Sequence, residues 1–332
     1  MEIHRSNLAQ SGLRYGLVAL IAAVMLLFPV FVTKPYYLHI FIMSCFGSVC
    51  AISWRFIRNM GQINFGPAGF IGIGAYTSAL FVMKLGFSFW LALPISGLMS
   101  ALIAILIGYP TLRLRGLYFA ITTFAFQEVL RTIWLRFKVP FGGPTGIYNI
   151  PFPDSIPLGF GEISFNTPAA YYYLAFFLLV VTVLFFSKVD KTRFGLTLGS
   201  IRESDNLAES VGVNLMRYQL LGWTIASFFT GLAGSFYAHY IRFIDPFTFS
   251  EYMTVDIIAY SIVGGLNFAW SPILGAFVLV SLSETLRSFG GHYAAFFIGL
   301  ALMAFVILSR EGVTHLALRL IGLSRHKLPQ HG

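Results

Sequence analysis

Apolar runs of about 20 residues recur along this 332-residue chain, and short stretches that carry its charges separate them. A helix needs roughly 20 apolar residues to cross the hydrocarbon core of a bilayer. Within lipid every backbone N–H and C=O must find a partner inside the protein, so crossing segments of this kind are helices. The sequence therefore predicts an all-α polytopic membrane protein with about ten transmembrane helices, at 15–33, 36–54, 64–83, 88–108, 116–135, 169–187, 218–240, 252–266, 272–287 and 292–309.

The composition supports a membrane protein and argues against a nucleic-acid partner. Residues are 57% hydrophobic and 11% charged, whereas soluble domains carry about 25% charged residues. The net charge is +9, but the basic residues stand singly or in pairs and form no block that would bind nucleic acid. In a chain surrounded by membrane lipid, such an excess sets the orientation of the spans.

The distribution of the basic residues predicts that both termini are cytoplasmic. With the N-terminus inside, 15 of the 22 Lys and Arg residues fall on the cytoplasmic side, as the positive-inside rule requires. This count needs 252–287 to cross twice, which fits its break at Gly264 and Gly265. The predicted parts are a cytoplasmic N-terminus (1–14), a permease domain (15–309) whose first span is retained rather than cleaved, and a basic cytoplasmic tail (310–332).

Two long loops connect predicted spans. The outer loop 137–168 holds six prolines and five glycines, so an irregular shape fixed by proline is expected. It is either a packing loop or a docking face for an external partner. The cytoplasmic loop 188–217 carries charges of both signs.

Within that cytoplasmic loop, Ser200 and Glu203 fit a capping box and predict a helix of about three turns that begins at Ser200. At 100° per residue, Ile201, Leu207, Ala208 and Val211 share an apolar face. Gly212 is a natural stop, and Asn214 can cap the next helix. Such a helix either rests on lipid or fits a groove of a protein partner.

Four stretches of the chain resemble the permease subunits of ATP-binding-cassette importers for branched-chain amino acids, specifically the LivM-like member of the pair. They are Gly61–Thr77, Leu114–Thr123, Gly142–Ile147, and a block from Thr192 to Tyr240 that resumes at Val263–Leu266. Asn64, Pro67, Asn267, Phe268 and Ser271 depart from the family pattern. The resemblance covers about residues 55–285 in the expected order.

The resemblance implies a complex in the inner membrane of a bacterial cell. Its members would be this chain, a homologous second permease, two cytoplasmic ATP-binding subunits, and a periplasmic or lipid-anchored substrate-binding protein. The helix in 188–217 would be the coupling helix that contacts the ATPases. The coupling candidates are Arg202, Glu203, Asn206, Ala208, Glu209, Ser210 and Gly212.

The chain itself contains no phosphate-binding loop of the Gly-x-x-x-x-Gly-Lys-Ser/Thr type, so ATP is expected on the partner subunits and no cofactor in this chain. Catalytic motifs and metal-ligand spacings are absent from the sequence too, and Cys45 and Cys50 suggest neither a disulfide nor a metal site. A transport subunit is expected, not an enzyme.

Polar and small residues within the spans are the candidates for the translocation path. Gln62, Asn64, Gly66 and Gly69 surround a possible break in the third span, where freed backbone groups could line the path; close helix packing at the glycines is the alternative. Asn267 is a further candidate.

Acidic residues near the outer side form a second group of path candidates. Glu128 and Asp256 could together receive the ammonium group of a zwitterionic substrate, since charges within a membrane are often functional. Alternatively, Glu128 forms a structural pair with Arg131, one turn later.

The resulting functional prediction is import of leucine, isoleucine and valine by alternating access. Two alternatives stay open: a related importer for urea, short amides or another small polar solute, and a stand-alone secondary transporter. The latter needs a coupling-ion site deep in the membrane, and few acidic residues are placed for one.

Overall fold

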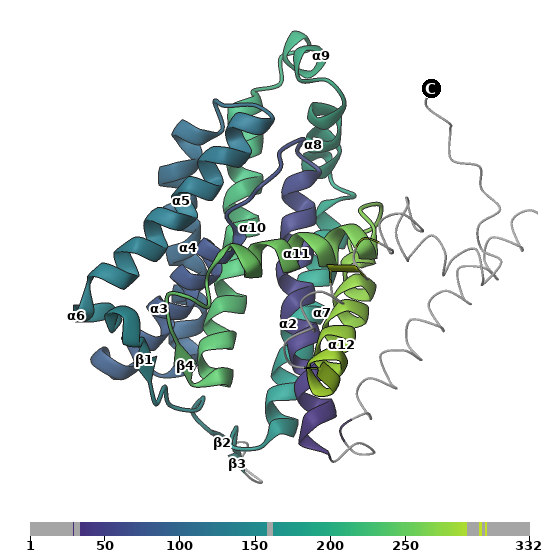
Figure 1. Cartoon of the computed structure of the whole chain (residues 1–332). Helices are drawn as coiled ribbons and strands as arrows, with labels where there is room; N and C mark the ends of the chain where they lie inside the picture. The colour runs from purple at the N-terminus through teal and green to yellow at the C-terminus, as the bar shows by residue number, and fades with distance from the viewer. Residues whose placement is uncertain (1–28, 30–33, 158–161, 291–298, 301–302, 304–332) are drawn as a thin grey trace, which may run out of the picture.

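A computed structural model describes residue 29 and residues 34–157, 162–290, 299–300 and 303. The described part is a bundle of helices with two short strand pairs at one end (Figure 1). In chain order the helices and strands are α2 (Pro35–Arg58), α3 (Pro67–Leu85), α4 (Phe89–Thr111), α5 (Leu117–Arg136), α6 (Lys138–Phe141), the 3-10 helix η1 (Gly143–Thr145), β1 (Ile147–Tyr148), β2 (Ile156–Pro157), β3 (Glu162–Ile163), α7 (Pro168–Val189), α8 (Arg193–Glu203), α9 (Asp205–Ser210), α10 (Leu215–Ile241), β4 (Phe243–Ile244), α11 (Glu251–Gly264) and α12 (Ser271–Gly290).

The predicted helical class is confirmed, and six predicted spans correspond to α2, α3, α4, α5, α7 and α10. Among the described residues, α2, α3, α4 and α7 are long and apolar enough to cross a membrane by length and composition. The predicted spans 15–33 and 292–309 lie almost wholly outside the described residues, as do 1–14 and 310–332. The number of ten transmembrane helices therefore stays a prediction.

Helix α10 is the centre of the bundle and packs most extensively against α4 and α3. Small residues allow this close approach. A Cβ atom on Gly234 of α10 would collide with the carbonyl oxygen of Ile71, and one on Gly74 of α3 would collide with that of Gly231. The hydroxyl of Ser100 on α4 donates to the carbonyl oxygen of Phe70 at 3.2 Å. These crossings hold α3, α4 and α10 together as one packed unit.

The loop 137–157 is attached to the end of α10, at the lower end of Figure 1. Strand β1 pairs antiparallel with β4, with Ile147 opposite Ile244. Arg242 donates from Nε to the carbonyl oxygen of Ile150 at 3.0 Å, and its guanidinium lies 4.1 Å from the centre of the Phe152 ring. These contacts support the interpretation as a packing loop, while a docking role stays a prediction.

The two short spans predicted at 252–266 and 272–287 correspond to helices α11 and α12, with the predicted break between them. That both helices cross the membrane stays a prediction. Helix α11 has 14 residues and is therefore about 21 Å long, shorter than the hydrocarbon core of about 30 Å. In Figure 1, α11 runs across the bundle at mid-height and α12 returns toward the lower end. The pair thus runs in one direction and back, as the charge count required.

Replacement of Gly234 by Ala should destabilise the bundle because the added methyl group meets backbone that cannot move aside. Overpacking of this kind costs about 1–3 kcal/mol and occasionally more. The control is Gly199→Ala in α8, where an added Cβ meets nothing within 4 Å; it should be neutral or stabilising by about 0.5–1 kcal/mol. Thermal unfolding of both variants in detergent measures the difference, and equal midpoints would contradict the proposed crossing.

Candidate functional site

The segment 193–210 projects from one end of the bundle, with α9 at the upper extreme of Figure 1. The prediction of one helix beginning at Ser200 is wrong. Ser200 lies inside α8, where its hydroxyl donates to the carbonyl oxygen of Leu196 at 3.2 Å. Thr192 caps α8, and Ser204 caps α9 by accepting from the N–H of Leu207 at 3.3 Å.

Two helices form because Ser204 has an extended backbone, with φ −158° and ψ 107°. Thr192 and Ser204 therefore each cap a helix in this segment, whereas the sequence suggested a single cap at Ser200. The other local predictions are confirmed: Gly212 has a positive φ of 87°, and Asn214 caps α10 by accepting from the N–H of Arg217 at 3.1 Å.

The predicted apolar face of this segment is also wrong, because the break at Ser204 changes the helical phase. Ile201 and Ala208 are buried, with exposed fractions of 0% and 5%, whereas Leu207 and Val211 are exposed by 67% and 74%. Burial of Ala208 places it beneath the surface that a partner would touch. The other coupling candidates Arg202, Glu203, Asn206, Glu209, Ser210 and Gly212 are all exposed.

Contacts with neighbouring links hold α8 and α9 against the bundle. Asp205 of α9 forms an ion pair of 3.5 Å with Arg115, which follows α4. Arg202 of α8 donates to Asn59 Oδ1 at 3.4 Å, and Asn59 follows directly after α2. The segment is thus connected to both the α2–α3 and the α4–α5 links.

A cleft of about 580 Å³ lies between the α4–α5 link and the turn from α9 to α10. Its lining includes Gln62, Arg113, Arg115, Asp205, Glu209 and Gln219. Charges of both signs and the amides of Gln62, Asn214 and Gln219 therefore face a space beside the coupling candidates. Of the path candidates, only Gln62 contributes to this lining.

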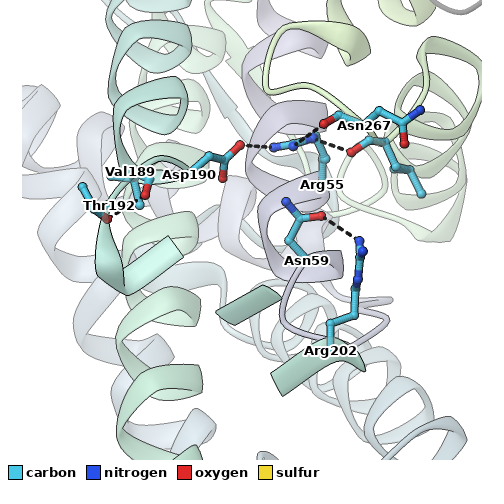
Figure 2. Close-up of polar contacts among 8 residues, drawn as sticks. Arg55, Asn59, Val189, Asp190, Thr192, Arg202 and Asn267 are labelled. Carbon is cyan, nitrogen blue, oxygen red and sulfur yellow. Dashed lines mark hydrogen bonds and ion pairs between the residues drawn. The ribbon is translucent and has the colours of Figure 1, made fainter. Parts of the chain in front are cut away.

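Arg55 is a site residue that the sequence analysis missed. It entered that analysis only as one of the basic residues counted to predict the orientation of the spans. Its side chain is 3% exposed, and Nη1 lies 2.8 Å from Asp190 Oδ2 in an ion pair. Nε donates to the carbonyl oxygen of Leu266 at 2.9 Å, and Nη2 donates to that of Asn267 at 3.4 Å. Figure 2 shows how the guanidinium joins the end of α7 to the α11–α12 link. The sequence signal that could have pointed to Arg55 is an arginine in the last turn of an apolar span.

Residues 59–66 are not helical, so the predicted break before Pro67 is confirmed. Asn64 is 1% exposed; its Oδ1 accepts from the N–H of Gly66 at 2.7 Å, and its carbonyl oxygen accepts from the indole of Trp54 at 2.7 Å. Gln62 is 3% exposed, and its Oε1 is buried without a hydrogen-bond partner within the described residues. The Asn64 side chain supports the shape of this link, and a role of either residue in the path stays a prediction.

The path candidates Gly66 and Gly69 are the places where this link and α3 meet α5. A Cβ on Gly66 would lie 2.6 Å from the carbonyl oxygen of Thr123, and one on Gly69 would lie 3.4 Å from the Cα of Gln127. Close packing is therefore the function that the geometry supports for both.

Gln127 and Thr254 form a buried polar contact that the sequence did not indicate. The hydroxyl of Thr254 on α11 donates to Gln127 Oε1 on α5 at 2.6 Å, and both side chains are buried. Their positions lie far apart in the sequence, so no local pattern could pair them.

Glu128 and Asp256 lie on different helices, α5 and α11, and their joint site for an ammonium group stays a prediction. Glu128 pairs with Arg131 at 3.0 Å, as its spacing suggested, and Arg131 also lies 3.6 Å from Glu251. Thr254 faces α5, next to Glu128. Asp256 is two residues further along α11, a rotation of about 200°, and therefore lies on the opposite side of the helix.

Another polar chain within the bundle centres on His239, which was missed as well. Its Nδ1 lies 2.8 Å from the carbonyl oxygen of Pro151, which can only accept, so Nδ1 carries the proton. Nε2 then accepts from the hydroxyl of Ser78 at 2.9 Å, and Ser78 accepts from Ser235 at 2.8 Å. This chain fixes the loop 137–157 against α3 and α10.

Comparison with known proteins finds a family match over residues 36–307, described as the permease component of the branched-chain amino acid transport system. The high-affinity branched-chain amino acid permease LivM of Escherichia coli is 34% identical over 273 residues, 76% of this chain and 64% of that protein. The LivM permease of Salmonella typhimurium is 33% identical over the same shares. The alignment thus spans less than two thirds of these relatives.

Permeases for other solutes are similar too. The nucleoside permease NupC of Lactococcus lactis is 27% identical over 73% of this chain and 78% of that protein. The guanosine permease NupQ of Bacillus subtilis is 28% identical over 72% and 77%. No solved structure matches the chain.

Replacement of either partner of the Arg55–Asp190 pair should destabilise the fold, because a buried charge is left without its partner. Breaking such a pair costs about 3–5 kcal/mol, whereas removing both charges is often neutral. Arg55→Met and Asp190→Asn alone should each lower stability, and the double variant should recover most of the loss. Denaturant unfolding of all four proteins measures this cycle. Additive losses in the double variant would show that the two charges are not coupled.

Proposed function

Because the chain belongs to the family of permease components of branched-chain amino acid transport systems, we propose that it is a membrane subunit of an ATP-driven importer. The carrying observation is the α8–α9 segment. It projects from the bundle (Figure 1), exposes Leu207 and Val211, and is attached to two interhelical links, α2–α3 and α4–α5. Apolar side chains exposed on a charged segment suit the groove of a protein partner.

ATP binding and hydrolysis are proposed on two partner subunits that contact α9 and the turn at Gly212. The exposed coupling candidates would surround Leu207 and Val211, as polar residues surround the apolar centre of many interfaces. Ala208, which is buried, would support that surface from beneath. ATP is assigned to partners because the sequence of this chain has no phosphate-binding loop.

The α8–α9 end is proposed to be cytoplasmic, and the end with β1–β4 to face outward. The positive-inside rule favours this orientation, since the stretches at the α8–α9 end carry most of the Lys and Arg residues. A substrate-binding protein would then deliver cargo at the β1–β4 end. The membrane is proposed to be the inner membrane of a bacterial cell, with both termini in the cytoplasm.

A homologous second permease is proposed to complete the path. Apolar side chains of α4 and α5 such as Leu98, Leu106, Leu117 and Tyr118 are exposed by 60%, 66%, 73% and 72%. Exposed surface of this kind requires lipid or another membrane subunit. Transport would follow alternating access: motion of the ATPases displaces α8 and α9, and the helices that surround the path change their relative positions.

The proposed cargo is leucine, isoleucine and valine, in line with the names of the LivM relatives. Nucleosides are the second candidate, because NupC and NupQ are similar over most of the chain. Both readings share the ATP-driven machine and differ only in the solute that the binding protein delivers.

Replacement of Leu207 and Val211 by Ser should reduce ATPase activity stimulated by the binding protein at least about tenfold. Each exposed apolar side chain that becomes buried in an interface contributes on the order of 1–2 kcal/mol, and 1.4 kcal/mol is a factor of ten. The measurement uses the purified complex in lipid vesicles. The control is Leu196→Ser on α8, equally apolar and 63% exposed, which should leave stimulation unchanged. Co-purification of no ATPase would sink the importer proposal and favour a stand-alone transporter.

Uptake assays should separate the cargo candidates. Vesicles with the wild-type complex and its binding protein should accumulate labelled leucine, and isoleucine and valine in excess should compete more than tenfold better than guanosine or urea. The reverse order of competition would replace the amino-acid proposal with the nucleoside or amide alternative while the ATP-driven machine stands.

A further inference from the structure

The Arg55 guanidinium is buried where a charge is expensive, and stability alone does not explain its presence. It is 2% exposed as a residue, and desolvating such a cation costs several kcal/mol. Apolar replacements of buried ion pairs are often as stable as the pair. The planar fork of an arginine can, however, hold several acceptors in fixed directions at once. Arg55 uses this property to contact two segments far apart in the sequence.

The first segment is the start of α8. Asp190 follows α7 directly, and the hydroxyl of Thr192 donates to the carbonyl oxygen of Val189 at 2.7 Å. A Cβ on Gly195 would collide with the carbonyl oxygen of Val189 and lie 2.8 Å from the Cα of Asp190. The turn between α7 and α8 is therefore tight, so that a displacement of α8 displaces Asp190 with it.

The far end of α8 also meets α2. Asn59 lies four residues after Arg55, on the same side of α2, and accepts from Arg202 Nη1 at 3.4 Å. Figure 2 shows both contacts along the last turn of α2. Gly61 has a positive φ of 83°, and a Cβ added to it would lie 3.3 Å from the Cα of Arg202, so the α2–α3 link passes close to α8. The Arg202 contact is long and exposed, whereas the contact at Asp190 is short and shielded from water.

The second segment is the α11–α12 link. Arg55 binds the backbone carbonyl oxygens of Leu266 and Asn267, so it holds the course of the chain rather than a particular side chain. Gly265 has a positive φ of 105° at the end of α11, so the link turns sharply there. A shift of this link is therefore passed to α11.

Helix α11 in turn contacts α5 at two points. Thr254 donates to Gln127 at 2.6 Å, and Glu251 lies 3.6 Å from Arg131. Among the described helices, α5 is only lightly packed against α3 and α4 compared with α10. Helix α5 is thus a lightly packed neighbour of α11.

We propose that Arg55 is the positioning residue that transmits displacement of α8 to the α11–α12 pair and from there to α5. The inference rests on the proposed function, in which α8 and α9 receive force from an ATPase. Asp190 is the input contact, and the carbonyl oxygens of Leu266 and Asn267 are the output contacts.

Arg55→Lys tests this assignment. A lysine keeps the charge for Asp190 but is a single point donor and cannot replace the fork toward both carbonyl oxygens. In vesicles with the leucine-loaded binding protein, stimulated ATPase activity should stay within about twofold of wild type. Leucine imported per ATP hydrolysed should fall at least about fivefold. This ratio does not depend on the amount of folded complex, so a merely structural role would leave it unchanged. Arg58→Lys, the same change one turn later on α2, is the matched control.

The variant Arg55→Met with Asp190→Asn covers the case in which Arg55→Lys fails to assemble, since it leaves no buried charge unpaired. It should also hydrolyse ATP without matching import. An unchanged import ratio in either assembled variant overturns the assignment. If the wild-type complex itself shows no ATPase stimulation, the proposed function fails and the transmission role fails with it. A stimulated wild type with an unchanged ratio in Arg55→Lys refutes only the role of Arg55.

Discussion

The close approach of α10 to α3 and α4 is the contact on which the rest of the bundle depends. It is possible only because glycines face backbone at the crossings of Gly234 with Ile71 and of Gly74 with Gly231. In lipid, helices gain little from burying apolar surface against one another, so van der Waals packing at small residues has to hold them together. The three helices form a rigid unit, and the other elements are arranged around it.

Around this unit, polar contacts connect the elements that packing holds less firmly. At one end, His239 and Arg242 attach the loop 137–157 to α10. At the other, Arg55 joins the start of α8 to the α11–α12 link, and Arg115 reaches α9. Few polar groups make these connections, and each of them is buried or joins two segments. This division between a packed centre and polar connections at the ends suits a machine whose outer elements move against a fixed centre.

The local features of the fold could be predicted from the sequence to a large extent. Helices at eight of the predicted spans, the break before Pro67, the cap at Asn214 and the stop near Gly212 all follow from apolar length and from Pro, Asn and Gly chemistry within a few residues. A failure arose where two local signals competed: Ser204 rather than Ser200 caps a helix, after a break in the segment.

In the candidate site too, features that depend on neighbouring residues in the sequence could be predicted, and features that depend on distant residues could not. The sequence determined that the chain is an all-helical membrane protein with an exposed charged segment and the family pattern of a permease component, because run length and motif spacing are properties of the chain itself. Only the tertiary structure decided that Ala208 is buried while Leu207 is exposed, that Thr254 meets Gln127, and that Arg55 meets Asp190 and Leu266. The physical reason is that burial and charge pairing depend on which helices come to lie side by side. Which helices lie side by side is determined by packing between residues distant in sequence, and the periodicity of a single segment does not contain that information.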